Sequence, residues 1–493
     1  MKNLKSSILK YGVTKNEFTS YFKNKIYQKF SEIDSTDSIS EECGIFGIYS
    51  SKNIDTFSIL QFGMFALQHR GQEACGISVL KDKQIKTTKS AGLVLDVFKK
   101  IEEPSDFQGN AAIGHTRYTT AGDGSRRNFQ PLYSANQFGN PNISLAHNGN
   151  LVGVDSLREE LKQEGLIFLA TSDTEVMLRS IQKNYDNKDI VSAIQKGTEK
   201  LRGAYSVLLL TQNELVAFRD PKGIRPLAMG KLEDGSIVFS SESCGLDAVG
   251  AIYERDVLPG EIVLVNNEGV QSYFIPQERE SKICAFEYIY FSRPDTNMQG
   301  IDVYDIRKES GKKLFEQSPV DADVVIGVPD SGVPAAIGFS EASGIPFEPI
   351  LVKNRYMSRS FIIPSQEMRE RVVNLKLNPI VSKIKGKRLV ILDDSIVRGT
   401  TAKLLIKILK EAGAKEIHLR SASPAIIAPC FLGIDMPNKN DLISAKMHIK
   451  ELTEFLQVDS LDFLKMSNLR KILGSENHCF GCFTEKYPVE NIG

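Results

Sequence analysis

The 493-residue chain contains no apolar run approaching the roughly 18 residues that a membrane-spanning helix needs. Its N-terminus also lacks the apolar core of a secretory signal. Neither sign of charge is in excess, because 61 Lys and Arg residues balance 61 Asp and Glu residues. That balance argues against a general nucleic-acid binder, although it says nothing about local basic pockets. We therefore expect neither a membrane nor a nucleic acid as a partner.

Cysteine is also scarce, with seven residues in the whole chain. In a long chain without an export signal, these residues are expected to be free thiols, metal ligands or catalytic groups rather than disulfides. The compartment is therefore predicted to be reducing, most simply the cytoplasm. The composition, 41% hydrophobic and 25% charged, is that of a soluble globular protein.

The first 42 residues differ from the rest of the chain. Residues 1–30 hold seven Lys, one Glu and no Asp or Arg, a net charge of +6, whereas residues 31–42 are acidic and rich in Ser. This composition predicts a poorly ordered leader. We expect this leader, residues 1–42, to be cleaved from the working protein. Targeting to an organelle is an alternative, against which the lack of Arg speaks.

The remaining length favours two domains. From residue 43 to about 270, short alternating apolar segments are broken by Gly and polar turns, as in antiparallel sheets, with helical periods interposed. After about residue 280, strands alternate with helices, which indicates a parallel sheet. We therefore predict domains at 43–270 and 271–440, followed by a tail at 441–493 that is helical in pattern.

Cys43 stands at the leading edge of the apolar run in "SEECGIFGIYS". A thiol is a good nucleophile only as thiolate and needs a base nearby. If the leader were removed before Cys43, the freed α-amino group, with a pKa of about 7.7 to 8.0, would be such a base. The alternative is an ordinary small core residue.

Four further motifs follow in order: "LQHRGQEACGISV" (67–79), "IGHTRYTTAG" (113–122), "LAHNGNLVG" (145–153) and "SDTEVM" (172–177). Together with "CGIFGIYS" they resemble the glutamine amidotransferases of the N-terminal-nucleophile (Ntn) class. The resemblance covers residues 43 to about 270 and implies an αββα layered sandwich with Cys43 as the nucleophile.

The same resemblance suggests roles for the other motif residues. Arg117 can hold the glutamine α-carboxylate through two donors, and Asp173 can accept from the substrate ammonium. His147 belongs to the same glutamine-binding set, where a structural role is favoured over that of a base. The Asn148 side-chain amide and the Gly149 backbone N–H can form an oxyanion hole.

The stretch "RLVILDDSIVRGTT" (388–401) carries the strongest single signal. The apolar "LVIL" predicts a buried strand, and ligands of open parallel sheets lie at the carboxyl ends of such strands. Asp393 and Asp394 stand at that end, where two adjacent carboxylates need a cation or ligand hydroxyls near them. The following residues open onto a helix N-terminus, an anion site; they include Ser395, Arg398, Gly399, Thr400 and Thr401.

This pattern fits a ribose 5-phosphate and resembles the signature of type I phosphoribosyltransferases, which implies a Rossmann-like parallel sheet. A Walker loop is excluded because no G-x-x-x-x-G-K-[ST] occurs. "GVPDSG" (327–332), with Asp330, Ser331 and Gly332, is suited to pyrophosphate. By resemblance, Ser331, Asp393 and Asp394 hold Mg²⁺, which neutralises the leaving pyrophosphate. Cations between the two motifs are candidate pyrophosphate contacts: Lys353, Arg355, Arg359 and Lys376.

A glutaminase fused to a phosphoribosyl-binding domain resembles the amidophosphoribosyltransferase family, as do "RDPKGIRPL", "IYFSRPDT" and "PCFLGIDMP". The implied reaction makes 5-phosphoribosylamine from phosphoribosyl pyrophosphate and glutamine, the first committed step of purine synthesis, with ammonia passed between two sites. The resemblance also implies a homotetramer and purine nucleotides as feedback inhibitors. Two features depart from the family: Ala425 stands where a second proline is usual, and the leader is long.

Four cysteines occupy the second half: Cys284, Cys430, Cys479 and Cys482. By spacing alone they are compatible with zinc, a redox dithiol or an Fe–S cluster. Their contexts, "KICAFEY", "APCFLGIDMP" and "HCFGCF", resemble one branch of the family, which is made with a propeptide and carries a 4Fe-4S cluster on these cysteines. Cys75 and Cys244 are expected in the core.

Two other functions share part of these features. A non-catalytic phosphoribosyl-binding regulator would be expected to have degraded nucleophile or oxyanion positions, whereas Cys43 and "HNGN" are intact. Another glutamine amidotransferase, such as a sugar-phosphate aminating enzyme or an asparagine synthetase, would share only the first half. The motif "DDSIVRGTT" argues against such an enzyme, because it would need a different second domain.

Overall fold

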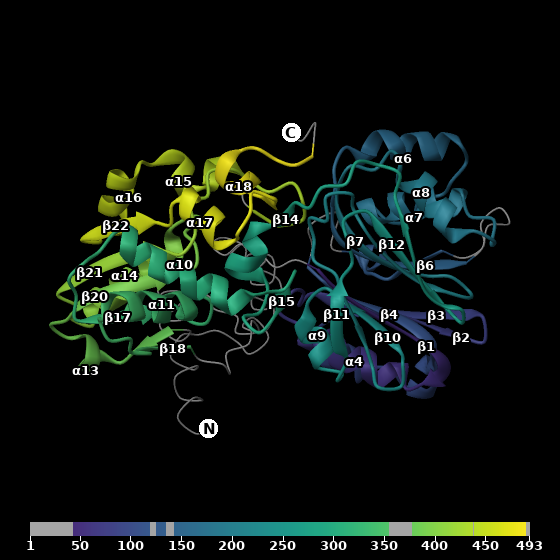
Figure 1. Cartoon of the computed structure of the whole chain (residues 1–493), viewed down its shortest axis with the longest axis horizontal. Helices are drawn as coiled ribbons and strands as arrows, with labels where there is room; N and C mark the ends of the chain where they lie inside the picture. The colour runs from purple at the N-terminus through teal and green to yellow at the C-terminus, as the bar shows by residue number, and fades with distance from the viewer. Residues whose placement is uncertain (1–42, 119–124, 135–141, 354–376, 437, 490–493) are drawn as a thin grey trace, which may run out of the picture.

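The computed structural model describes residues 43–118, 125–134, 142–353, 377–436 and 438–489. The chain forms two lobes that lie side by side (Figure 1). One lobe contains two antiparallel sheets with helices on their outer sides, and the other contains a smaller parallel sheet. Both architectures agree with the sequence predictions.

The first antiparallel sheet has seven strands and is centred on β1, the strand that follows Cys43. Helix α4 begins where the Asp55 side chain accepts from the Ser58 amide, an N-cap, and it covers one face of the sheet. The strands, in spatial order, are β11 (Ile252–Asp256), β9 (Ala228–Lys231), β10 (Ile237–Ser240), β1 (Gly44–Ile54), β4 (Gly109–Arg117), β2 (Ala74–Lys81) and β3 (Gln84–Ala91). The helices on the outer face are α4 (Thr56–Ala66), α5 (Val94–Phe98) and α9 (Ser243–Asp247).

The second antiparallel sheet has six strands and packs face to face on the first. Apolar side chains from both sheets, such as Ile45, Ile113 and Leu208, form the core between them. The strands, in order, are β13 (Gly269–Phe274), β12 (Glu261–Asn266), β8 (Leu215–Arg219), β7 (Gly203–Leu210), β6 (Ile143–Leu151) and β5 (Leu132–Ser134). Helices α6 (Val154–Gln163), α7 (Asp173–Lys183) and α8 (Ile190–Thr198) cover its outer face, which completes the expected αββα sandwich.

The second lobe is built on a four-stranded parallel sheet with helices on both faces. Its strands, in order, are β17 (Val324–Gly327), β20 (Arg388–Asp393), β21 (Glu416–Ser421) and β22 (Ser460–Phe463). Helices α10 (Val303–Gln317), α11 (Val333–Ser343) and α17 (Met466–Ile472) pack on one face, and α14 (Thr400–Glu411) and α16 (Ile449–Leu456) on the other. The tail thus contains the expected helices, but it also adds strand β22 to the sheet.

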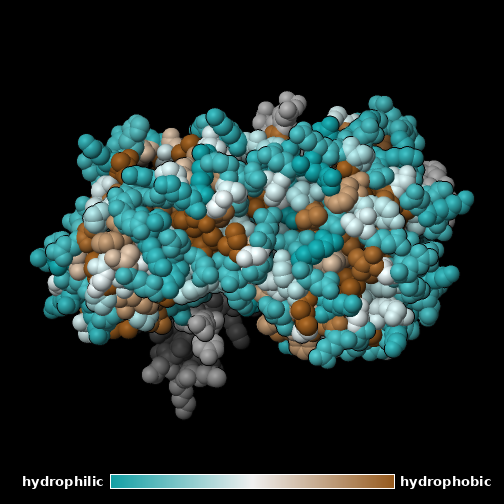
Figure 2. Space-filling model, in the orientation of Figure 1, coloured by the Kyte–Doolittle hydropathy of each residue, from teal (hydrophilic) through white to brown (hydrophobic). Residues whose placement is uncertain are grey.

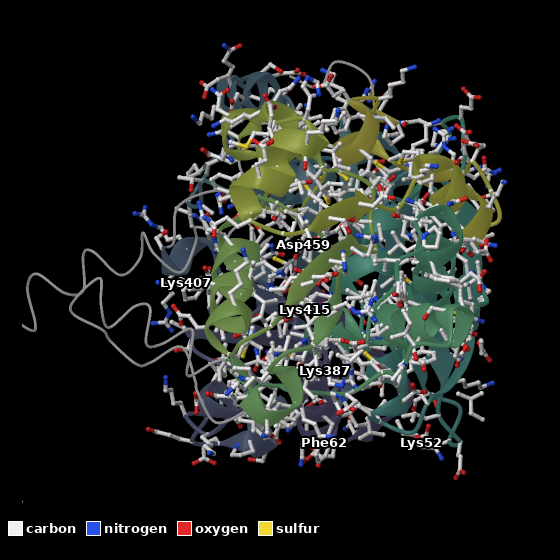
Figure 3. The ribbon with its side chains drawn as sticks, turned by 90° about the vertical axis from the view of Figure 1, so that its left-hand side faces the viewer. Lys52, Phe62, Lys387, Lys407, Lys415 and Asp459 are labelled. Carbon is white, nitrogen blue, oxygen red and sulfur yellow. The ribbon has the colours of Figure 1, made fainter. Side chains whose placement is uncertain are left out.

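Lys387, Lys415 and Asp459 directly precede β20, β21 and β22, and Figure 3 shows them stacked at the outer end of the second lobe. Because all four strands are parallel, their carboxyl ends lie at the opposite edge, which faces into the molecule. This edge carries Asp393. The fold therefore directs the expected phosphoribosyl site towards the first lobe.

Short elements of the second lobe lie against the first, where the Cys284 amide donates to the Ile224 carbonyl and Arg70 donates to Glu287. A two-stranded parallel ladder joins β14 (Ile283–Cys284) to β23 (His478–Cys479), and the π-helix η5 (Glu287–Phe291) follows β14. Hydrophilic residues cover most of the face shown in Figure 2, with scattered apolar patches. Among the described residues, none of the helices is long and apolar enough to cross a membrane.

Candidate functional site

Cys43 lies immediately before β1 and is 7% exposed. Its thiol donates to the Tyr118 carbonyl oxygen at 3.3 Å. Burial raises the pKa of the Cys43 thiol to about 11, although the Tyr118 hydrogen bond and Arg117 oppose this rise. A thiol with such a pKa is protonated at neutral pH, so it needs a base to become a nucleophile.

Arg117 and Asp173, predicted to bind glutamine, converge on Cys43. The pairing of β1 with β4 places Gly44 opposite Thr116, so that Arg117 ends its strand beside the thiol. Asp173 opens helix α7, and its carboxylate accepts from the Leu151 and Thr174 amides. Both charges act on the pKa of Cys43, Arg117 lowering it and Asp173 raising it. A cation and an anion beside the nucleophile suit the two charged groups of an α-amino acid.

His147, Asn148 and Gly149 follow one another on β6. The His147 ring lies between the Thr174 hydroxyl, 3.2 Å from Nδ1, and the Ala204 carbonyl, 3.4 Å from Nε2. Burial lowers the pKa of His147, which favours the neutral ring and agrees with the predicted structural role. The Asn148 side chain is buried, and its Nδ2 donor has no hydrogen-bond partner. Such a donor is available to an oxyanion.

Gly149 has a φ of +143° and packs tightly on the neighbouring strand. A Cβ atom there would lie 2.1 Å from the Ala204 carbonyl oxygen, so no other residue fits without moving the strand. The other side of the same glycine contacts the second lobe. A Cβ on Gly433 would lie 3.1 Å from the Gly149 Cα, and the Asn150 side chain donates to the Phe431 carbonyl at 2.9 Å. The candidate oxyanion hole is therefore buttressed by residues of the other lobe.

The second candidate site lies at the carboxyl edge of the parallel sheet. The register of β17 and β20 pairs Gly327 with Leu392, so the loops after both strands begin side by side. The Ser331 hydroxyl donates to one Asp394 oxygen, and the Ser395 hydroxyl donates to the other at 2.7 Å. Burial raises the pKa values of Asp393 and Asp394, and the Asp394 charge raises that of Asp393 further. A divalent cation would compensate this concentration of negative charge.

Other predicted phosphoribosyl contacts surround these carboxylates. Gly332 precedes α11, and Gly399, with a φ of +78°, precedes Thr400 and Thr401 at the start of α14. Two helix N-termini therefore meet at this edge, where unpaired amides favour anions. The Lys353 ammonium donates to Asp330 at 2.8 Å, and Arg398 lies in the turn before Gly399. Lys376, Arg355 and Arg359 lie outside the described residues.

Four cysteines come from three segments of the second half of the chain. Cys284 and Cys479 are register partners in the β14–β23 ladder. The Cys482 carbonyl accepts from the Ile427 and Ala428 amides, which lie shortly before Cys430 in the chain. Burial raises the pKa of Cys482, and the other three cysteines raise it further. Within the described ranges, no group of three or more His, Cys, Asp or Glu residues is arranged to hold a metal ion. All seven cysteines are free thiols.

Sequence reasoning missed a buried ionic network between the lobes. The Arg70 guanidinium donates to the Cys43 carbonyl at 3.2 Å, to Glu242 at 2.6 Å and to Glu287 at 2.8 and 3.0 Å. Arg70 lies in the "LQHRG" motif and Glu287 in "CAFEY", so both stood in segments already singled out. No local pattern links residues 217 positions apart, and only the fold shows that they meet.

Comparisons with known proteins agree with this geometry. A glutamine amidotransferase domain profile matches residues 115–248, and a phosphoribosyl transferase domain profile matches residues 303–422. The chain is 46% identical to amidophosphoribosyltransferase 2 of Arabidopsis thaliana, a chloroplastic protein, over 91% of this chain and 80% of the relative. It is 43% identical to amidophosphoribosyltransferase of Bacillus subtilis over 92% of this chain and 95% of the relative.

Solved structures give the same result. The glutamine phosphoribosylpyrophosphate amidotransferase of B. subtilis, in complex with ADP and GMP, superposes with a TM-score of 0.85 at 43% identity. The match covers 91% of this chain and 98% of that one. The similarity therefore extends over both lobes.

Proposed function

The chain belongs to the amidophosphoribosyltransferase family, and we propose that it converts glutamine and phosphoribosyl pyrophosphate into 5-phosphoribosylamine, glutamate and pyrophosphate. The observation that supports this proposal is that a buried cysteine and an unpartnered buried amide donor, Asn148 Nδ2, lie in one lobe, while two adjacent carboxylates lie at the sheet edge of the other. A non-catalytic regulator would not need the cysteine and its amide donor, and an unrelated amidotransferase would not have the paired carboxylates.

In the first site, the Cys43 Sγ atom attacks the side-chain carbonyl carbon of glutamine. Arg117 binds the substrate α-carboxylate, and Asp173 accepts from its ammonium group. Asn148 Nδ2 and the Gly149 amide stabilise the oxyanion of the tetrahedral intermediate. Ammonia leaves, and water hydrolyses the resulting thioester to glutamate. The base is the α-amino group of Cys43, which requires cleavage of residues 1–42.

In the second site, the ribose of phosphoribosyl pyrophosphate lies against Asp393 and Asp394, and its 5-phosphate lies at the start of α14. The loop of Asp330, Ser331 and Gly332 and the Lys353 ammonium bind the pyrophosphate. Ser331, Asp393 and Asp394 would hold Mg²⁺, which supplies charge neutralisation for the leaving pyrophosphate. Ammonia displaces pyrophosphate from C1.

Ammonia must pass from one site to the other because the two reactions occur in different lobes. The segment at Phe431 and Gly433, which contacts Asn150 and Gly149, places the second lobe directly against the first site. The inward-facing carboxyl edge of the parallel sheet supports the same transfer. We propose that residues 43–270 hydrolyse glutamine and that residues 271–440 transfer the phosphoribosyl group. Residues 441–493 are the proposed tail that supports the second domain.

A 4Fe-4S cluster is the proposed cofactor of Cys284, Cys430, Cys479 and Cys482. Burial raises the pKa values of Cys284, Cys479 and Cys482, and neighbouring cysteines raise them further; a cationic cluster would stabilise such groups as thiolates. Arg225, buried between Glu287 and three of these cysteines, adds a positive charge beside them. A bound cluster would supply a cross-link between the tail and the rest of the second lobe.

Three further properties of the family are proposed for this chain. The B. subtilis relative binds ADP and GMP, so purine nucleotides are the proposed feedback inhibitors. A homotetramer is the proposed assembly, and light scattering coupled to size exclusion tests it. Free thiols support a reducing compartment, for which the cytoplasm is proposed.

The experiment that tests the proposed function supplies purified protein with glutamine, phosphoribosyl pyrophosphate and Mg²⁺ and measures pyrophosphate and glutamate together. Equimolar release of both supports the proposal. Glutamate release without pyrophosphate, even when ammonium salts are added, contradicts it.

A further inference from the structure

The cation that touches the nucleophile's own backbone, Arg70, is neutralised from both lobes, by Glu242 of the first lobe and Glu287 of the second. Arg70 is 1% exposed, and its Nε donates to the Cys43 carbonyl. Its two terminal nitrogens donate to both oxygens of Glu287, a two-donor pair with fixed geometry. Glu287 is fully buried and opens the π-helix η5, a rare element that is frequent at functional sites.

Glu287 is also hydrogen-bonded further into its own lobe. The Ser292 hydroxyl donates to Glu287 at 2.8 Å, and the buried Arg307 donates to the Ser292 carbonyl at 2.6 Å. The charge of Asp394, in the phosphoribosyl site, acts on Arg307. Arg225 donates to Glu287 from the side of the cysteines. Glu287 is thus hydrogen-bonded to Arg70, which holds the Cys43 carbonyl, to Ser292 of its own lobe and to Arg225 beside the cysteines.

We propose that Glu287 is a positioning residue for glutamine hydrolysis, holding Arg70 against the Cys43 carbonyl so that the geometry of the nucleophile in one lobe depends on a carboxylate of the other. This inference rests on the proposed function. The two-donor pair fixes the plane of the guanidinium, and with it the direction of the Nε–H bond that anchors Cys43. Without this pair, Arg70 retains Glu242, but its orientation is no longer fixed on both sides.

The test compares two reactions of the same full-length protein. Glu287→Gln keeps the shape of the side chain and removes its charge. Glutamine-dependent synthesis is expected to lose roughly tenfold or more in kcat, because misplaced reacting groups lose rate steeply. The KM for glutamine is expected to stay within about twofold, since Arg117 and Asp173 are untouched. Synthesis from ammonium salts, which bypasses Cys43, should change by less than about twofold.

A purely structural role predicts the opposite pattern. Glu287 belongs to the second lobe, so a folding defect would lower ammonia-dependent synthesis at least as much as glutamine-dependent synthesis. Equal losses in both reactions, or no loss in either, would overturn the proposal. Absence of ammonia-dependent synthesis in the unmodified protein would instead count against the proposed function.

Two more variants complete the design. Glu261→Gln removes another buried carboxylate, paired with Arg255 in the first lobe, and is the matched control, expected to keep the ratio of the two activities unchanged. If Glu287→Gln does not fold, Glu287→Asp keeps the buried charge but withdraws it from Arg70. It should show the same selective loss of glutamine-dependent kcat, and an unchanged ratio would overturn the proposal.

Discussion

Replacing Gly433 by Ala tests whether the second lobe shapes the oxyanion hole. The added Cβ would lie 3.1 Å from the Gly149 Cα and 3.2 Å from its carbonyl carbon, distances at which the neighbour must yield by a few tenths of an ångström. Gly149 cannot retreat, because it already packs on the Ala204 carbonyl oxygen. Gly433 also has a φ of +113°, which an L side chain adopts only with strain.

The expected size follows from the geometry. Loss of one whole oxyanion donor costs about 10² to 10³ in kcat, and a displacement of about 1 Å costs about 10². A shift of a few tenths of an ångström at the Gly149 amide should therefore lower kcat for glutamine hydrolysis roughly tenfold, about 1.4 kcal/mol of transition-state stabilisation. Binding of glutamine depends on Arg117 and Asp173, so its KM should change little.

The assay measures glutamate release with glutamine and pyrophosphate release with ammonium salts. Gly250→Ala is the matched control, because Gly250 also has a positive φ, +74°, but nothing within 4 Å of an added Cβ. An unchanged kcat for glutamine in the Gly433 variant, or an equal loss in the Gly250 variant, would refute the contact argument.

Three other predictions concern the nucleophile, the paired carboxylates and the four cysteines of the second half. Cys43→Ala should abolish glutamine-dependent synthesis and leave ammonia-dependent synthesis, measured by pyrophosphate release; loss of both would contradict separate sites. Because burial and Asp394 raise the pKa of Asp393, protons compete with the cation, so Mg²⁺ affinity should fall as pH falls and binding should release protons. Calorimetry in two buffers of different ionisation enthalpy measures that release, and its absence would contradict the assignment. Anaerobically purified protein should contain about four iron atoms and absorb broadly in the visible range, and Cys430→Ser should remove both; iron-free protein with full activity would count against the cluster.

Local pattern was sufficient to predict most of the elements. The pattern of "KRLVILDDSIVRGTT" predicts a strand, a loop and a helix, and the structure has β20 and α14 there. The apolar alternation from Cys43 onwards correctly indicated antiparallel sheets. Strand β22 was missed within a tail of helical pattern, because only four residues pair and their partner is β21, about 40 positions earlier. Tertiary pairing, rather than local periodicity, decided that segment.

The residues of the candidate site also fall into those that local motifs identify and those that only the fold brings together. Residues that bear chemistry in a motif, such as Cys43, Asp173 and Asp394, could be named from the sequence. Arg70 and Glu287 could not, because their role arises from a contact across more than two hundred residues. A buried carboxylate looks like any other Glu until the fold shows which cation it neutralises. The same holds for Gly433, whose contact with Gly149 depends on how the lobes pack.

The most direct test of the whole account is the fate of the glutamine amide nitrogen. Purified protein is given glutamine labelled with ¹⁵N in its side-chain amide, phosphoribosyl pyrophosphate, Mg²⁺ and an excess of unlabelled ammonium at a pH where ammonium is mostly protonated. The account predicts that the phosphoribosylamine formed carries ¹⁵N, and that Cys43→Ala gives only unlabelled product. Unlabelled product from the unmodified protein, while glutamate is being released, would contradict transfer between the two lobes.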